Sequence, residues 1–119
     1  MTKTAVQVDL VCIDDPVETM RFHGVLSEGK LASPEMYCHV YEWYSEEIGY
    51  AVQPGILNDE EGNCRKYVGE WGYGDKSSIV FEFLDRPLAV GQEIVRTDKD
   101  DGKTSVYTYR ITAITDLLA

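Results

Sequence analysis

The residues best suited to bind a metal ion lie between Asp98 and Gly102, where the sequence reads DKDDG. An EF-hand loop places oxygen ligands at its first, third and fifth positions, glycine at the sixth and glutamate at the twelfth. With Gly102 at the sixth position, Lys99 takes the third and Thr108 takes the twelfth. The Lys99 ammonium would then occupy a position where a metal-binding oxygen is required. The stretch is therefore predicted to be the tip of a β-hairpin, with the glycine supplying the positive φ of the turn.

A second acidic stretch, NDEEGN at 58–63, fails the same test. With Gly62 at the sixth position, Leu57 stands at the first and Val68 at the twelfth, and neither side chain carries an oxygen. This stretch is also predicted to be a hairpin turn between two strands. Neither a metal nor another cofactor is predicted for the chain.

The glycine-rich stretch GEWGYGDKSS at 69–78 resembles a phosphate-binding loop only superficially. Asp75 stands directly before the lysine, and a strand rather than a helix is expected to follow, so the required spacing and context are both missing. A turn or bulge is predicted here. One alternative stays open, a ligand-contacting loop in which Trp71 and Tyr73 stack on a sugar or a base.

The histidines and cysteines show no recognisable catalytic or zinc-binding pattern. Cys12, Cys38 and Cys64 are odd in number and form no C-x-x-C pair, which is typical of reduced thiols in a cytosolic protein. A zinc site built from Cys38, His39, His23 and Cys64 would need long-range convergence and is not favoured. Serine-nucleophile, H-E-x-x-H and Cys–His signatures are also missing, so the protein is predicted not to be an enzyme.

Length and composition indicate one soluble domain over residues 1–119, with a net charge of −10 and a pI near 4.5. The alternating start, MTKTAVQVDL, does not read as a secretory signal, and no apolar run is long enough to span a membrane. We therefore expect a cytoplasmic protein. Such a negative charge repels nucleic acids and anionic membranes, so direct binding to either is not expected.

The negative charge is concentrated in one third of the chain. Between Lys30 and Arg65 there is no lysine or arginine, and seven acidic residues there leave only −3 for the rest of the chain. These residues are Glu35, Glu42, Glu46, Glu47, Asp59, Glu60 and Glu61.

Most of the chain is predicted to form antiparallel strands. Residues 4–13 alternate apolar and polar side chains, and a second strand over 18–26 is expected to pair with them, with Gly24 marking a possible bulge. The stretches YAVQPG, CRKYVGEWGYG, SSIVFEFL and QEIVRT are predicted to be further strands. Residues 103–114 complete a hairpin that places Tyr107, Tyr109 and Ile111 on one face.

Residues 34–48 are predicted to form one amphipathic helix, because both parities of a strand would be largely apolar there. Ser33 is a suitable N-cap, Pro34 suits the first helical position, and Gly49 can close the C-terminus. A helical projection gathers the apolar side chains on one side. The predicted fold class is α+β, with a strongly curved antiparallel sheet or small barrel of about six or seven strands packed on this helix.

The predicted function is protein–protein binding, as an inhibitor of a basic, nucleic-acid-handling partner. Small acidic proteins that imitate nucleic-acid phosphates act in this way, and anti-defence inhibitors and toxin-immunity proteins are familiar classes; the analogy is one of size and charge. The predicted partner-binding residues combine acidic and aromatic side chains. They are Glu35, Glu42, Trp43, Glu46, Asp59, Glu60, Glu61, Trp71 and Tyr73.

Two alternatives remain open at this stage. The first is a small-ligand-binding β-barrel with Trp71, Tyr73, Tyr107 and Tyr109 around its pocket. The second is an oligomeric, phage-type structural or assembly protein, because small strand-rich domains associate readily through exposed strand edges. The sequence does not decide the oligomeric state.

Overall fold

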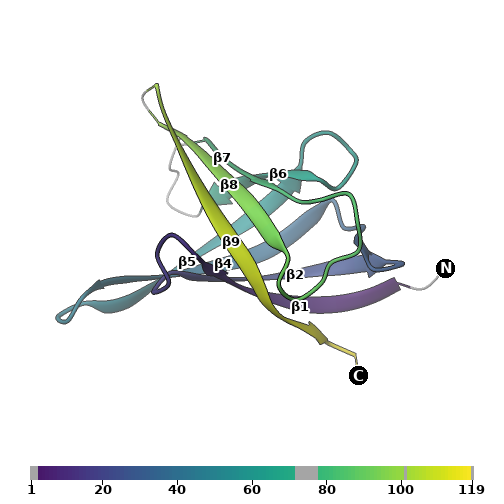
Figure 1. Ribbon diagram of the computed structural model, residues 1–119, viewed down its shortest axis with the longest axis horizontal. Coiled ribbons are helices and arrows are strands. Elements are labelled where there is room, and N and C mark those ends of the chain that lie inside the picture. Colours follow the sequence, from purple (N-terminus) through teal and green to yellow (C-terminus); the bar gives the residue numbers. More distant parts are fainter. Residues whose placement is uncertain (1–2, 72–77, 101, 119) are drawn as a thin grey trace.

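Nine antiparallel β-strands and their connections make up the part of the chain that the structure describes, which contains no helix (Figure 1). The computed structural model describes residues 3–71, 78–100 and 102–118, and only the backbone of Tyr44, Trp71, Ser78 and Asp100. The strands are β1 Lys3–Cys12, β2 Thr19–Ser27, β3 Lys30–Leu31, β4 Glu35–Ser45, β5 Gly49–Asp59, β6 Lys66–Trp71, β7 Ser78–Glu82, β8 Glu93–Asp100 and β9 Lys103–Asp116.

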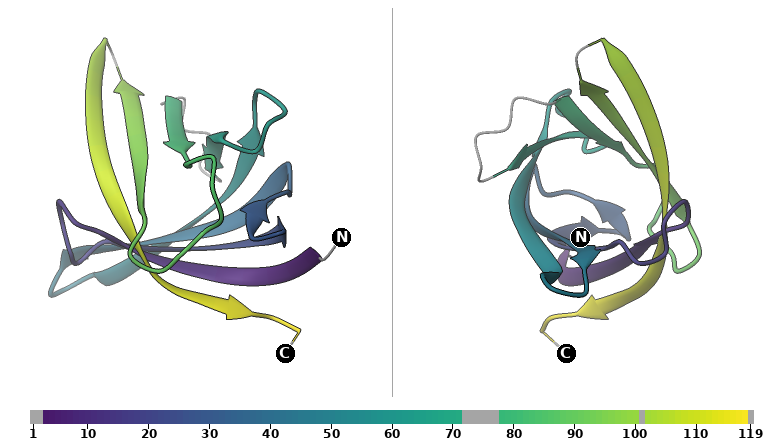
Figure 2. Two further views of the ribbon diagram at one scale, coloured as in Figure 1. Left: turned by 45° about the vertical axis from the view of Figure 1, so that its right-hand side comes forward. Right: turned by 90° about the vertical axis from the view of Figure 1, so that its left-hand side faces the viewer.

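Eight of these strands close into a barrel, because β1 pairs with both β2 and β9. The order around the barrel is β1-β9-β8-β7-β6-β5-β4-β2, and the short β3 adds to β2. Figure 2 shows the strands wrapping around a common interior. The predicted α+β class, with a sheet of about six or seven strands and one helix, is therefore wrong. The described chain is all-β.

The predicted helix over 34–48 is instead strand β4 and the turn into β5. Met36, Cys38 and Val40 point into the barrel and are almost completely buried. Tyr37, His39 and Tyr41 alternate with them and point outward, and because two of these three are tyrosines, the outward positions do not read as a polar parity. The helix was predicted because a strand was expected to keep one polar face.

The residues that suggested helix caps have other roles. The Ser33 hydroxyl accepts a hydrogen bond from the Val25 amide at 3.0 Å, so it ties β2 to the segment before β4. Gly49 has a φ of 76° in the β4–β5 hairpin turn, where the Ser45 hydroxyl accepts a hydrogen bond from the Ile48 amide. Glycine at positive φ is as typical of hairpin turns as of helix ends.

The predicted pairing of the first two strands is confirmed, with β1 and β2 in continuous register from Lys3 opposite Ser27 to Val11 opposite Thr19. Gly24, however, is not a bulge, since it lies in regular register. A Cβ atom there would come within 2.7 Å of the Met36 sulfur, so the glycine leaves room for the core.

Strand β5 is longer than predicted and continues through Pro54 and Gly55 to Asp59. Proline lacks an amide hydrogen and is tolerated where a strand has no neighbour on one side. In the described part of the chain, β6 pairs with β5 only from Gly55 onward, so Pro54 falls just beyond that pairing.

The barrel interior is filled by side chains. Among its largest fully buried members are Tyr67, Tyr109, Phe22 and Phe81. Phe83 packs edge-to-face on both Phe22 and Tyr67, with ring centroids 5.6 and 5.5 Å apart. The Tyr67 hydroxyl donates a hydrogen bond to the Ser33 carbonyl at 2.7 Å, which satisfies its polar atom.

Candidate functional site

The most unusual surface of the protein is the outward side of β4 and β5. The register sets four cross-strand pairs on this side, and each pair combines aromatic, imidazole or apolar side chains. We call this surface the outer aromatic face. It consists of Tyr37 opposite Ile56, His39 opposite Pro54, Tyr41 opposite Val52, and Trp43 opposite Tyr50.

The outer aromatic face is open to solvent. Tyr37 is 69% exposed, Tyr50 59%, Val52 46% and Trp43 44%, although each would gain stability from burial. The Trp43 and Tyr50 rings contact each other edge-to-face with centroids 5.1 Å apart. Contiguous exposed apolar surface of this kind marks interaction sites.

The part of this face that carries Trp43 and Tyr50 belongs to the β4–β5 hairpin, which extends past the barrel as an arm (Figure 1). Strand β2 pairs with β4 only as far as Tyr41, and β6 pairs with β5 only from Gly55. Within the described chain, the only strand pairing of residues 42–54 is therefore that between β4 and β5. The arm presents Trp43 and Tyr50 away from the body of the barrel.

Acidic side chains border this face. Glu46 and Glu47 are exposed at the tip of the arm, and Glu70 lies opposite Ile56 in the β5–β6 register. The neighbouring cation, Arg21 on β2, is paired with Asp9 at 2.7 Å. The unbalanced charge around the face is therefore negative.

The structure does not bring the predicted partner-binding carboxylates together. Glu35 begins β4 and Glu46 follows its last residue, so the two lie roughly 35 Å apart at the usual strand rise. Glu42 is half-buried on the side of β4 that carries the core residues, and its carboxylate accepts a hydrogen bond from Gln53 at 2.8 Å. Of the predicted residues, Trp43 lies on the outer aromatic face and Glu46 on its border.

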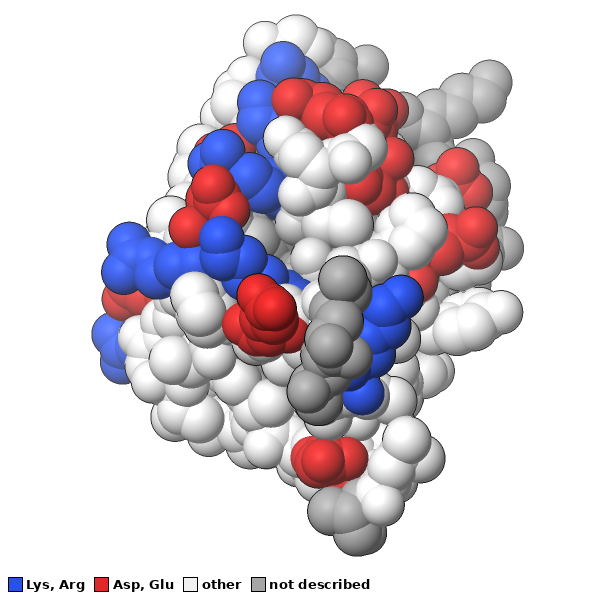
Figure 3. Space-filling model, turned by 90° about the vertical axis from the view of Figure 1, so that its right-hand side faces the viewer, with Lys and Arg blue, Asp and Glu red and all other residues white. Residues whose placement is uncertain are grey.

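The remaining predicted residues lie elsewhere. Glu60 and Glu61 are exposed in the β5–β6 connection on another side of the barrel. Figure 3 shows that the face turned to the viewer there carries basic and acidic side chains intermixed. The backbone of Trp71 ends β6, but its side chain, like all of Tyr73, lies outside the described residues.

Asp59 organises its own loop. Its carboxylate accepts hydrogen bonds from the amides of Glu61, Gly62 and Cys64 at 3.2, 3.1 and 2.9 Å. Partial burial acts to raise the pKa of Asp59, but these hydrogen bonds outweigh it and the pKa is lowered. This carboxylate serves as an internal acceptor for the turn that the sequence predicted at 58–63.

A half-buried polar cluster, which we call the mouth cluster, closes the barrel end beside the arm. The Arg96 guanidinium donates to both carboxylate oxygens of Asp98 at 2.7 and 2.8 Å and to the Tyr109 hydroxyl at 3.0 Å. The Tyr109 hydroxyl donates to Glu18, whose carboxylate is also 3.7 Å from Arg96. Glu42 neighbours Glu18.

The protonation states of the mouth cluster follow from these contacts. Burial and the nearby Glu42 carboxylate raise the pKa of Glu18, with Tyr109 and Arg96 acting against them. Burial acts to lower the pKa of Arg96, but its bonds to Asp98 and Tyr109 raise it overall. Burial also raises the pKa of Tyr109, so at neutral pH its hydroxyl remains a donor to Glu18.

Sequence reasoning missed the mouth cluster and most of the outer aromatic face. The cluster joins residues from β8 and β9 to the β1–β2 loop, and these segments are distant in the sequence. The face had a local signal, since Tyr37, Tyr41 and Trp43 alternate with buried residues and favour strands over helices.

The described residues include no group of three or more histidine, cysteine or acidic side chains placed to hold a metal ion. Cys38 points into the core while His39 points outward, so these neighbours cannot share a ligand site. No helix that could cross a membrane occurs in the described residues.

Comparison of the chain with known protein families, curated proteins and solved structures finds no match.

Proposed function

We propose that the protein is a non-catalytic binding protein that docks on a partner protein through its outer aromatic face. The observation that carries this proposal is the set of four solvent-facing aromatic and apolar cross-strand pairs on β4 and β5. Tryptophan and tyrosine are enriched among the residues that dominate binding energy at protein interfaces. Trp43 and Tyr50, in contact with each other and exposed on the arm, are the proposed anchors.

The proposed partner presents a basic surface. Glu46, Glu47 and Glu70 border the aromatic face, and Arg21 is neutralised by Asp9. Opposite charges at the rim of an interface accelerate association and favour the correct partner. Nucleic-acid-handling proteins have such surfaces, and the proposed role is to inhibit one of them by covering its basic site. The dispersed carboxylates support an acidic rim around an apolar centre, rather than an array that imitates phosphates.

Face-specific photo-cross-linking in cells that make the protein tests this proposal. A benzophenone amino acid replaces Tyr37 or Tyr50 on the face, and Val106 serves as the control because it is 60% exposed on the outside of β9. The proposal predicts that both face positions capture the same basic protein and that the control does not.

Two other results would argue against the proposal. Capture of a second copy of the chain from the face positions would favour the alternative of an assembly protein. Equal capture from Val106 would show that the outer aromatic face has no special role.

A further inference from the structure

A second concave surface lies on the outer side of β6, β7 and β8, separate from the outer aromatic face. It is a groove of about 410 Å³. Its floor is made by Val68, Val80 and Thr97, which lie side by side in register across the three strands, and by Val95. Outward valines on three adjacent strands give this part of the barrel an apolar patch with walls around it.

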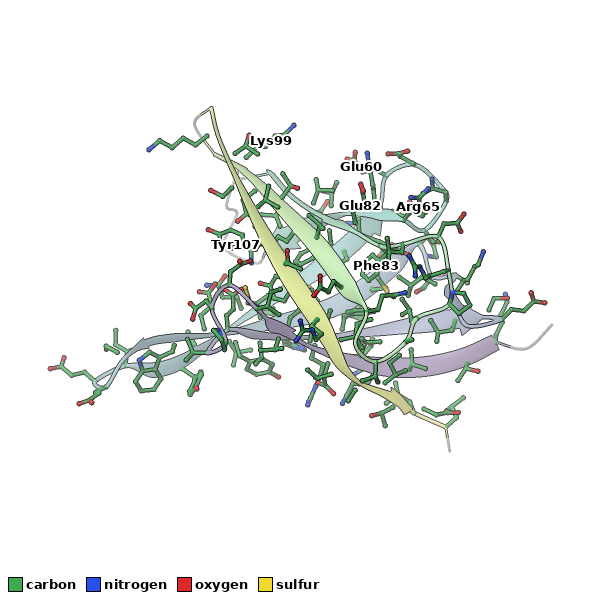
Figure 4. The ribbon with its side chains drawn as sticks, viewed as in Figure 1. Glu60, Arg65, Glu82, Phe83, Lys99 and Tyr107 are labelled. Atoms are coloured by element: carbon green, nitrogen blue, oxygen red, sulfur yellow. The ribbon has the colours of Figure 1, made fainter. Side chains whose placement is uncertain are left out.

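The walls of the groove carry charge. Glu60 and Glu61 come from the β5–β6 connection, and Glu82 lies on β7 opposite Lys66 of β6. Figure 4 shows Glu60 and Glu82 on the same side of the barrel, with Lys99 farther along β8. The groove therefore has an acidic end and a basic end, joined by the valine floor.

The acidic end has more negative than positive charge. The Lys66 ammonium is 3.5 Å from the Glu61 carboxylate and 3.9 Å from that of Glu82. The Glu60 side chain makes no ion pair or hydrogen bond with any residue in the described ranges. Arg65 also lies beside Glu61 and Glu82. Three carboxylates thus face two cationic side chains at this end, which leaves one negative charge next to an apolar floor.

We propose that this groove binds a small organic cation, a primary amine or guanidinium attached to a compact apolar body. The cationic group would lie among Glu60, Glu61 and Glu82, and the apolar body would cover Val68, Val80 and Val95. The volume is within the range of about 300–1,000 Å³ that small-molecule sites occupy. An apolar floor with a few charged groups at one end is also the usual composition of such sites.

Phenethylamine is a suitable probe, with phenethyl alcohol and hydrocinnamate as neutral and anionic counterparts of similar shape. Binding is measured by two-dimensional amide NMR on the full chain. The amine is expected to bind with a dissociation constant on the order of 1 mM. It should shift the amide signals of Val68, Val80 and Thr97, and the alcohol and the carboxylate should bind at least about fivefold more weakly.

Three variants assign the binding to the groove. Val95 is 41% exposed and lies opposite Glu82. Val95→Lys therefore places an ammonium group of the protein itself at the acidic end and should abolish amine binding. Glu60→Gln with Glu82→Gln should weaken it about fivefold. Glu93→Gln, on β8 but outside the groove, should leave it unchanged. The amide spectrum of each variant shows whether the fold is retained.

Several results would overturn the proposal. Equal binding of the amine and the alcohol would show that the cationic group does not contribute to binding in the groove. Signal shifts confined to the outer aromatic face, or undiminished binding by Val95→Lys, would place the site elsewhere. Binding of a lysine-containing peptide without binding of phenethylamine would identify the groove as a protein contact.

Discussion

Arg96 is expected to be the most important charged residue for the stability of the barrel. Its side chain is only 12% exposed, and it makes two short hydrogen bonds to Asp98 and a third to Tyr109. Its guanidinium also lies 5.9 Å from the Phe81 ring centroid and 5.4 Å from that of Tyr107. Arg96→Met keeps much of the apolar stem but removes every one of these polar contacts.

The loss of unfolding free energy caused by Arg96→Met is set by the carboxylates that would remain without their cation. Asp98 and Glu18, at 20% and 17% side-chain exposure, would lose their cation. Breaking a fully buried ion pair costs about 3–5 kcal/mol, and the residual exposure here reduces this to about 2–4 kcal/mol. For a domain of this size, the melting temperature should fall by about 10 °C.

The assay is urea unfolding followed by circular dichroism, with Arg110→Met as the matched control. Arg110 pairs with Glu93 at 3.1 Å, but both side chains are about half exposed, so its loss should cost less than about 1 kcal/mol. Combining Arg96→Met with Asp98→Asn should give a coupling energy of about 1–3 kcal/mol. Equal destabilisation by Arg96→Met and Arg110→Met would refute the reasoning.

Three further predictions concern other parts of the fold. The folded-state pKa of Glu18 is raised, so its contribution to stability is fully present below the unfolded pKa of about 4.3 and is lost as pH rises through the folded pKa. Glu18→Gln should therefore gain stability relative to the wild type as pH rises from about 4 to about 8; a constant difference would argue against a raised pKa. Cys12 and Cys38 are buried, and burial raises the pKa of both thiols, that of Cys38 to about 12. Ellman's reagent should thus modify only the half-buried Cys64 quickly in the native protein and all three thiols in denaturant, whereas rapid native labelling of three would contradict the core assignment. Gly29 has a φ of 84° and a Cβ there would meet Pro87 at 2.9 Å, while Gly91 has a φ of 93° and open space. Gly29→Ala should therefore destabilise the protein more than Gly91→Ala, which should cost about 1 kcal/mol by thermal unfolding; the reverse order would contradict the close approach.

Sequence reasoning predicted the strands that keep one polar face. The alternation in β1 and β2 identifies both strands, and the glycines at 62 and 102 mark turns between strands that do form hairpins. It failed at β4, where Tyr37 and Trp43 face solvent while Met36 and Val40 fill the core. Comparing the hydrophobic pattern with strand and helix periodicity assumes that exposed positions are polar. A surface suited to binding violates that assumption.

The candidate sites depend on which distant segments become neighbours in the barrel and on which way each side chain points, and neither can be read from the sequence. The mouth cluster requires β8 and β9 to lie beside the β1–β2 loop, which occurs because the barrel closes between β1 and β9. The acidic segment is unusual in composition, but strand alternation places Glu42 on the inward side of β4 and Asp59 accepts hydrogen bonds within the turn at 58–63. Net charge along a segment does not show which side chains share a surface.

The most direct test of the proposed function uses the cross-linked partner after purification. Its affinity is measured for the wild-type protein and for a variant that lacks the two proposed anchors, Trp43 and Tyr50. Trp43→Ser with Tyr50→Ser should weaken binding by at least about thirtyfold, because each is proposed as an interface hot spot. Val106→Ser, on the outside of β9, should bind like the wild type. Wild-type affinity should also fall with increasing salt, since the rim is acidic and the partner basic. Binding of the double variant with unchanged affinity would contradict the proposal that the outer aromatic face is the docking surface.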